Sequence, residues 1–322
     1  MQLRSIQRLE LPPTADMHVH LRQAGLMDLV APTVRQGGVD TVFVMPNLVP
    51  PLTTVKQVLE YQSQLRAIIP GVRCLMSLFL HPSVTPEVIA EAAAAGITGV
   101  KLYPQGVTTN SESGVSDLES FYATFAAMER HGLGKPYSAA VEAVRACGPT
   151  VGATITAHHL YLTSHDACCD PFAFCKPIPK KPTDRDALVR AVTGGDSKFF
   201  FGSDSAPHPL QSKTSAAPGK APAGVFTQPF VTQLVLLALE EAIERGVITE
   251  ADVTQEKLEG FLSRFARRFY QLPEPDLSGK RIVLERKGER IPKSVRSDDG
   301  AIEVGVSRAE AEVFSLRWEE AA

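Results

Sequence analysis

The sequence predicts an α/β fold of the (β/α)8-barrel type, in which parallel strands alternate with helices. Short β-rich runs alternate with amphipathic helical stretches along the chain, as in βα units and unlike a β-sandwich or a helical bundle. Side chains that could carry chemistry recur at the carboxyl ends of the predicted strands, which is the end where such a barrel builds its site. They belong to His18, His20, Asn47, Lys101 and Asp204.

Six strands are predicted from β-rich runs, and they cover 15–21, 41–45, 74–80, 99–103, 152–158 and 198–202. Helical periodicity marks 55–69, 86–95 and 184–193, with two further helical stretches at 117–133 and 139–147. From about residue 281 strand-like pieces return. We therefore expect one barrel domain over residues 1–322, with residues 281–322 packed on it as a small β-rich extension.

Composition and charge exclude several classes of protein. The 322 residues are 44% hydrophobic and 21% charged, as in a folded globular protein. A net charge of -3 without a basic cluster argues against a nucleic-acid partner and favours a small-molecule substrate. No apolar run of about 18 residues occurs, and residues 1–8 lack an apolar core of signal-peptide length. We therefore expect a cytoplasmic protein without a membrane partner. The five cysteines form no Cys-x-x-Cys pair and are expected to be reduced thiols.

The segment 16–22, with the sequence DMHVHLR, is the strongest sign of chemistry in the chain. Successive side chains of a strand alternate between its two faces, so His18 and His20 point the same way and can bind one metal ion. Arg22 continues the same face. Because a guanidinium pairs with a carboxylate through two hydrogen bonds, we expect Arg22 to hold a carboxylate of the substrate beside the metal.

Two charged residues lie in or just after strands that are otherwise apolar. Lys101 lies in the run GVKLYP, where burial of a free ammonium is costly, so it needs a charge partner or a chemical modification. Asp204 follows the run FFFGS and precedes His208. A carboxylate at the mouth of a barrel is suited to act as a metal ligand or as a general base.

With these motifs the chain resembles the metal-dependent amidohydrolases and, within them, the short stand-alone type of dihydroorotase. Five segments in the same order carry the resemblance, which runs from about residue 10 to the C-terminus. They are 16–22, 44–47 (VMPN), 99–104 with 106–111 (GVTTNS), 156–160 (TAHHL) and 202–208 (GSDSAPH). The resemblance implies an amidohydrolase barrel and reversible, zinc-dependent interconversion of dihydroorotate and N-carbamoyl-aspartate, a step of de novo pyrimidine biosynthesis.

The resemblance also implies roles for individual residues. His18, His20 and Asp204 would bind zinc, and Asp204 would also be the general base. Lys101 would react with carbon dioxide to give a carbamate that bridges two zinc ions per subunit, which resolves the burial of its charge. The substrate would be held by Arg22 and Asn47 at its carboxylate, by Lys176, His208 and Ala223, and by Thr108 and Thr109 on a lid loop. A homodimer is expected from the family.

The chain departs from the family between the fourth and fifth predicted strands. Family members carry His-Gly-Glu and Glu-His motifs on the fifth and sixth barrel strands, whose histidines hold the second zinc, and neither motif is present here. About 250 residues make eight βα units, so each takes roughly 30, and Lys101 and His158 are too close in sequence for three units. We therefore predict a barrel that lacks two βα units near 133–138. Impaired catalysis follows, because active sites tolerate displacements of only about 1 Å.

Other histidines are candidates to replace the missing ligands. His131 ends a predicted helix and His81 follows the third strand, so both are expected to be solvated rather than metal-bound. His158 and His159 end the strand at 152–158, and one of them is expected to face the pocket.

Two other functions fit the same motifs. A hydantoinase-like or allantoinase-like enzyme would hydrolyse a different cyclic amide, although Arg22 and Asn47 favour a substrate that carries a carboxylate. A non-catalytic, dihydroorotase-like binding subunit would follow from the loss of the second set of ligands. Turnover of dihydroorotate against hydantoin tests the first alternative, and binding without turnover would indicate the second.

Overall fold

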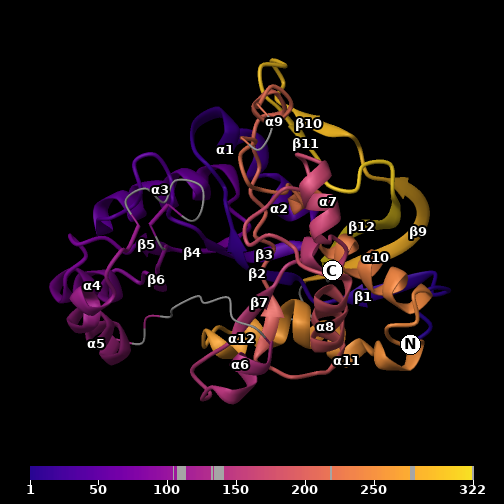
Figure 1. The fold of residues 1–322 in the computed structure, drawn as a ribbon, viewed down its shortest axis with the longest axis horizontal. Helices are drawn as coiled ribbons and strands as arrows, with labels where there is room; N and C mark the ends of the chain where they lie inside the picture. Colours follow the sequence, from indigo (N-terminus) through magenta and orange to yellow (C-terminus); the bar gives the residue numbers. More distant parts are fainter. Residues whose placement is uncertain are drawn as a thin grey trace.

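The computed structural model of the chain describes residues 1–103, 105–106, 114–131, 133, 141–217, 220–275 and 280–320 (Figure 1). Parallel strands lie at its centre with helices on the outside, and the last strands of the chain run along one side. No helix in these ranges is both long enough and apolar enough to cross a bilayer.

Each of the six predicted strand ranges contains an observed parallel strand. β2 pairs with β3 and β3 with β4, while β5 pairs with β6 and β7 with β8. The third predicted strand is divided at Met76, because its ladder turns there from β3 to β6. The strands are β2 (Thr14–Val19), β3 (Val39–Val44), β4 (Arg73–Leu75), β5 (Ser77–Phe79), β6 (Gly99–Lys101), β7 (Ala153–Ile155) and β8 (Phe199–Phe201).

The chain that continues from β8 lies beside β2. Backbone bridges connect Val19 with Ser205 and Ser205 with Val225, and the N–H of His20 donates to the carbonyl of Ser205 at 3.0 Å. Across the molecule the strands therefore follow the order β6, β5 with β4, β3, β2, β8, β7. Within the described ranges no ladder joins β6 to β7. Figure 1 shows β4, β5 and β6 on one side with α3, α4 and α5, and β7 nearer to α6 and α8.

Helices connect the strands, and local sequence explains where two of them begin. Thr54 caps α3 in a capping box with Gln57, and Thr85 caps α4. The helices predicted at 55–69, 86–95 and 184–193 are confirmed. Those predicted at 117–133 and 139–147 overlap α5 and α6, and residues 132, 139 and 140 of these two predictions lie outside the described residues. The α-helices are α1 (Ala24–Val30), α2 (Thr33–Gln36), α3 (Val55–Ile68), α4 (Pro86–Ala94), α5 (Tyr122–His131), α6 (Val141–Ala146), α7 (Ser164–Cys169), α8 (Pro182–Thr193), α9 (Leu210–Thr214), α10 (Val231–Glu244), α11 (Gln255–Glu259) and α12 (Phe265–Phe269).

Two groups of buried apolar side chains hold strands and helices together. The larger group includes Phe199 and Phe201 of β8 and most of α10. The smaller group lies against α12 and takes Phe200 of β8 instead. The consecutive phenylalanines of β8 thus serve both groups, which explains a strand with an unbroken apolar run. The smaller group consists of Ala15, Met17, Phe43, Met45, Leu75, Phe200 and Ala266.

The end of the chain forms strands, as predicted from about residue 281 onwards. β9 (Lys280–Arg290) pairs antiparallel with β12 (Glu312–Glu320) and, on its other edge, with β1 (Arg8–Leu11), a partner that the sequence did not indicate. β10 (Ser294–Arg296) and β11 (Glu303–Gly305) form a separate antiparallel pair. The larger sheet is attached to α2, because Nε1 of Trp318 donates to the carbonyl of Arg35 at 2.8 Å and the Arg35 guanidinium lies 3.7 Å from the ring centroid of Trp318.

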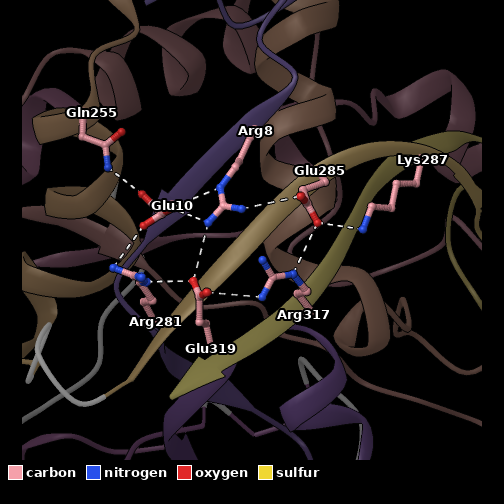
Figure 2. A network of polar contacts seen from close by, with 8 residues as sticks. All are labelled: Arg8, Glu10, Gln255, Arg281, Glu285, Lys287, Arg317 and Glu319. Carbon is pink, nitrogen blue, oxygen red and sulfur yellow. Dashed lines mark hydrogen bonds and ion pairs between the residues drawn. The ribbon is translucent and has the colours of Figure 1, made fainter. Parts of the chain in front are cut away.

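Charged side chains of alternating sign cover one face of the sheet formed by β1, β9 and β12 (Figure 2). Glu319 lies between Arg8 and Arg281, and Glu285 lies between Arg8 and Arg317. Exposed ion pairs of this kind contribute only about 0 to 1 kcal/mol each. The stability of the sheet therefore depends on its apolar residues, among which Ile282, Leu284 and Phe314 are buried.

A buried ion pair connects β3 to α12 and gives a test of this packing. Arg267 is 4% exposed, its Nη2 lies 2.5 Å from Asp40 Oδ1, and its Nε donates to Ser263 Oγ at 3.2 Å. Removal of one partner leaves the other charge buried and uncompensated. We expect Asp40→Ala to lower the free energy of unfolding by about 3 kcal/mol, measured by urea denaturation.

Glu274→Ala is the matched control, because it removes the partner of Arg268 in an ion pair whose side chains are both more than half exposed. Its expected effect is below about 1 kcal/mol. Equal effects of the two variants would show that Asp40 does not compensate the buried charge of Arg267.

Candidate metal-binding site

A bulge near the end of β2 orients the histidines of the DMHVHLR segment. The register against β3 passes from Asp16 opposite Val42 to Val19 opposite Val44, so β2 carries one extra residue there. Oδ1 of Asp16 accepts the N–H of His18 at 3.1 Å and the N–H of Ser203 at 2.7 Å. Asp16 therefore stabilises the bulge and ties β2 to the segment after β8. The motif alone indicates no role for Asp16, although an acid inside an apolar strand is a signal of one.

His18, His20 and Asp204 meet at the carboxyl ends of β2 and β8. Asp204 Oδ1 lies 3.3 Å from Nε2 of His18 and 3.1 Å from Nε2 of His20, and the three potential ligand atoms lie within 4.8 Å of one another. The N–H of Asp204 donates to the carbonyl of His18 at 2.7 Å. Gly202 permits close packing on both sides of this segment, because a Cβ there would lie 3.1 Å from Cβ of His18 and 2.6 Å from Cγ2 of Thr154.

Burial sets the charge state of this cluster. It lowers the pKa of His18 and of His20, so both imidazoles are neutral at pH 7. Burial by itself would raise the pKa of Asp204, but the neighbouring histidines outweigh it and hold that pKa well below its usual range. The cluster thus presents two imidazole nitrogens and a carboxylate in the protonation states that bind metal ions.

Lys101 ends β6 and is a further charged group near the cluster. Burial lowers the pKa of Lys101 to about 8, against the opposing charge of Asp204. Its Nζ lies 5.3 Å from the ring centroid of Tyr103, and it forms no ion pair with any described residue. The neutral amine is therefore more accessible near pH 7 than it is in an exposed lysine.

Arg22 lies beyond the end of β2, which stops at Val19, so the prediction that it continues the strand face is wrong. The backbone turns there: φ is 61° at Arg22, and it is 45° at Asp204. Such left-handed conformations are rare outside glycine and are concentrated at functional sites. The side chain is 9% exposed, and its Nε donates to the carbonyl of Pro207 at 2.8 Å. The Tyr61 hydroxyl donates to the Arg22 carbonyl at 2.5 Å and fixes the turn.

His208 lies between Arg22 and Ala223. Its Nε2 is 3.1 Å from Nη2 of Arg22 and 3.0 Å from the carbonyl oxygen of Ala223. Burial and the neighbouring guanidinium lower the pKa of His208 to about 3, so the ring is neutral at pH 7. A neutral Nε2 either accepts from Arg22 or donates to Ala223, and a bound anion that takes up the guanidinium would favour the second arrangement.

The other predicted substrate-binding residues occupy different settings. Asn47 is buried, 4% exposed, just past the end of β3, while Lys176 is exposed next to Cys175. Thr108 and Thr109 lie outside the described residues.

A second group of potential ligands lies at the end of β7. His158, His159 and Cys175 place their potential ligand atoms within 4.8 Å of one another. The prediction that one of the two histidines faces the pocket rested on their place after a strand. Cys175 carried no such signal, because it is distant from them in sequence and belongs to no cysteine motif. Only the fold brings it beside His158.

Comparison with known proteins gives a consistent result, although no family model matches the chain. The "Probable dihydroorotase" of Schizosaccharomyces pombe is 44% identical over 332 residues, which cover 90% of this chain and 94% of the relative. The dihydroorotase of Saccharomyces cerevisiae is 34% identical over 373 residues, which cover 98% of this chain and 99% of the relative. The crystal structure of S. cerevisiae dihydroorotase in complex with 5-fluoroorotic acid superposes with a TM-score of 0.87 at 33% identity and covers 98% of this chain and 100% of that one.

We expect the cluster of His18, His20 and Asp204 to bind one zinc ion, and His20→Asn tests this. Loss of one ligand should raise the dissociation constant of that ion by more than about 100-fold. After dialysis at a fixed free zinc concentration, native mass spectrometry should therefore find one zinc ion fewer in the variant than in the wild type.

His81→Asn is the control for this measurement. Within the described ranges the ring of His81 bonds only to Ser83, whose Oγ lies 2.9 Å and whose N lies 3.2 Å from Nδ1, and it belongs to neither cluster. Its zinc content should equal that of the wild type. The same zinc content in His20→Asn would rule the cluster out as a metal site.

Proposed function

The chain belongs to the dihydroorotase family of the amidohydrolase superfamily, and from this premise we propose that it opens and closes the cyclic amide of dihydroorotate, with N-carbamoyl-aspartate as the open form. One observation carries the proposal most directly: two neutral imidazoles and the carboxylate of Asp204 meet at one end of the parallel strands, with buried Arg22 beside them. The site thus offers ligands for a metal ion that would act on the amide. It also offers a cation that would bind the substrate carboxylate. The reaction is a step of pyrimidine biosynthesis.

The residues of the cluster fit a zinc ion. Imidazole and carboxylate are ordinary zinc ligands, and cobalt or manganese would accept the same set. His18, His20 and Asp204 would hold the ion. When bound, it supplies polarisation of the amide carbonyl and activation of water at neutral pH.

Lys101 is proposed to carry a carbamate formed with carbon dioxide. The unprotonated amine is the form that reacts, and burial makes this form accessible near pH 7. The modification would replace a half-buried cation, which has no ion-pair partner among the described residues, by an anion whose two oxygens could serve as metal ligands. This role remains an inference from the family motif GVKLYP.

Asp204 is proposed to carry the proton between the attacking water and the amide nitrogen. Its depressed pKa keeps the carboxylate unprotonated in the resting site, as a base requires. The hydrogen bond from the Asp204 N–H to the His18 carbonyl holds the residue at the reacting end of β2. The same carboxylate can thus serve as ligand and as base.

Arg22 is proposed to bind the substrate carboxylate, with Asn47, His208 and Ala223 completing the pocket. Burial weakens the competition of water for the guanidinium, and its remaining N–H groups can form a two-point contact with an anion. Lys176 and the Thr108 and Thr109 loop remain proposals that rest on the family motif alone. A hydantoin lacks the carboxylate, so this pocket favours dihydroorotate over the hydantoinase alternative.

The variant Arg22→Lys tests the proposed carboxylate contact, because lysine keeps the charge and loses the planar two-point geometry of the guanidinium. A charge-assisted hydrogen bond contributes about 1.5 to 3 kcal/mol, so the dissociation constant of N-carbamoyl-aspartate should rise by roughly 10-fold to 100-fold. Isothermal titration calorimetry measures this change independently of turnover.

Arg66→Lys, on the exposed side of α3, is the control and should leave the constant unchanged. Thermal unfolding of Arg22→Lys verifies that the variant stays folded when the contacts of residue 22 with Pro207 and Tyr61 are disturbed. Unchanged affinity in a folded Arg22→Lys variant would contradict the assignment. Binding without turnover in the wild type would support the non-catalytic alternative.

The barrel is proposed to lack two βα units between β6 and β7, which makes this form a slow enzyme. The alignment with the S. cerevisiae relative runs over 373 residues, more than the 322 of this chain, so the relative has internal residues without a counterpart here. The described parts of β6 and β7 are not paired with each other. Both observations agree with the absence of the His-Gly-Glu and Glu-His motifs. One domain, with residues 281–322 as an extension packed on it, is proposed from the sequence. A homodimer is proposed from the family.

Insertion of the corresponding segment tests the effect on catalysis. At equal zinc content the chain should hydrolyse dihydroorotate at least about 100-fold more slowly than the S. pombe relative, since displacements near 1 Å cost about that factor. A chimera that receives the relative's residues between Leu133 and Ala139 should recover most of the difference in kcat.

A glycine–serine segment of the same length is the matched insertion control and should restore nothing. If the unmodified chain turns over dihydroorotate as fast as the relative, the proposed impairment is wrong, while the family assignment stands.

A further inference from the structure

We propose that His158, His159 and Cys175 together bind one transition-metal ion of the zinc type. The three side chains belong neither to the cluster of His18, His20 and Asp204 nor to the ligands that the family motifs assign. The proposal concerns metal binding by these residues and does not depend on the proposed reaction.

His158 provides the first argument. It is completely buried, and neither of its ring nitrogens has a hydrogen-bond partner among the described residues. A buried polar atom without a partner costs about 1 to 3 kcal/mol, so a histidine used only for packing would be a poor choice here. Burial and the neighbouring His159 lower the pKa of His158 to about 3, which leaves a neutral ring with a free lone pair. A metal ion would satisfy that lone pair.

His159 is already oriented as zinc-binding histidines are. Its Nε2 lies 2.9 Å from the carbonyl oxygen of Pro177 and its Nδ1 lies 2.6 Å from the hydroxyl oxygen of Thr156. A metal-bound histidine commonly donates its other N–H to a backbone carbonyl, which fixes the ring and its tautomer. Binding of a metal ion by the ring would replace one of these two contacts, while the other would hold the ring in place.

Cys175 supplies the soft ligand. It is 2% exposed, and its thiol contacts the same Pro177 carbonyl at 3.6 Å. Zinc bonds of about 2.0 to 2.1 Å to nitrogen and 2.3 Å to sulfur place ligand atoms roughly 3.5 Å apart in a tetrahedron. The observed spread of at most 4.8 Å needs side-chain shifts of about 1 Å to close. Three protein ligands leave the fourth position open, as in catalytic zinc sites.

The cluster of His158, His159 and Cys175 lies near the cluster of His18, His20 and Asp204. His158 follows β7, whose neighbour β8 leads to Asp204, and the charge of Asp204 acts on all three residues. The site therefore lies at the same end of the strands as the first cluster. In a chain without the His-Gly-Glu and Glu-His motifs, it would give the protein a second metal ion from different residues.

Cobalt titration tests the proposal, because a thiolate bound to Co²⁺ gives a charge-transfer band in the near ultraviolet. The full chain with Cys147→Ser, Cys168→Ser and Cys169→Ser serves as parent, since these are its exposed thiols. We expect the band to appear and to saturate with one equivalent of thiolate-bound cobalt. Cys175→Ser should abolish it, and His158→Gln should weaken cobalt binding by more than about 100-fold.

Two further variants separate this site from others. Cys74→Ser removes the other buried thiol and should leave the band intact. Asp204→Asn should also leave the band while native mass spectrometry records the loss of the ion at the first cluster. Circular dichroism verifies that each variant is folded. If Cys175→Ser does not fold, Cys175→Ala is used in its place. The absence of a band in the folded parent, or a band that persists without Cys175, overturns the proposal, whatever the outcome for dihydroorotate turnover.

Discussion

The contact between β2 and the segment that follows β8 is the constraint on which the site depends. Ser203 and Asp204 donate their backbone N–H groups to Asp16 and His18, and Ser205 accepts from His20. These bonds place the Asp204 carboxylate within 3.3 Å of both imidazoles. The bulge in β2, the absence of a side chain at Gly202 and the left-handed backbone at Asp204 all serve this one junction. The local strain is sustained because several hydrogen bonds determine the geometry at once.

Burial then determines the chemistry of the residues gathered there. Removal of water makes the histidines neutral and brings the amine of Lys101 within reach of its neutral form. Asp204 stays anionic because the neighbouring histidines outweigh the effect of its burial. Arg22 stays cationic at pH 7 even though burial lowers its pKa to about 10. A carboxylate between two imidazoles, next to a guanidinium, is suited to bind a metal ion and an anionic substrate side by side.

The sheet is continuous on one side of this site and interrupted on the other. From β6 through β3 and β2 to β7 each strand has a neighbour, directly or through the segment after β8, whereas the described parts of β6 and β7 share no ladder. An unpaired strand edge exposes backbone donors and acceptors. Lys101 ends one of these strands and His158 follows the other, so both residues lie next to the interruption.

The sequence by itself determined the strands, the main helices and the first cluster, because these depend on local periodicity and on short motifs such as DMHVHLR. It also led to the prediction that two βα units are missing, since the chain length between Lys101 and His158 limits what can be built there. Residues whose role depends on contacts between distant segments could not be read in this way. The bulge held by Asp16, the pairing of β1 with β9, the turn that carries Arg22 off the strand face and the approach of Cys175 to His158 were decided only by the tertiary structure. In each case the partner lies far away in sequence, and side-chain periodicity carries no information about which distant backbone groups will be within hydrogen-bonding distance.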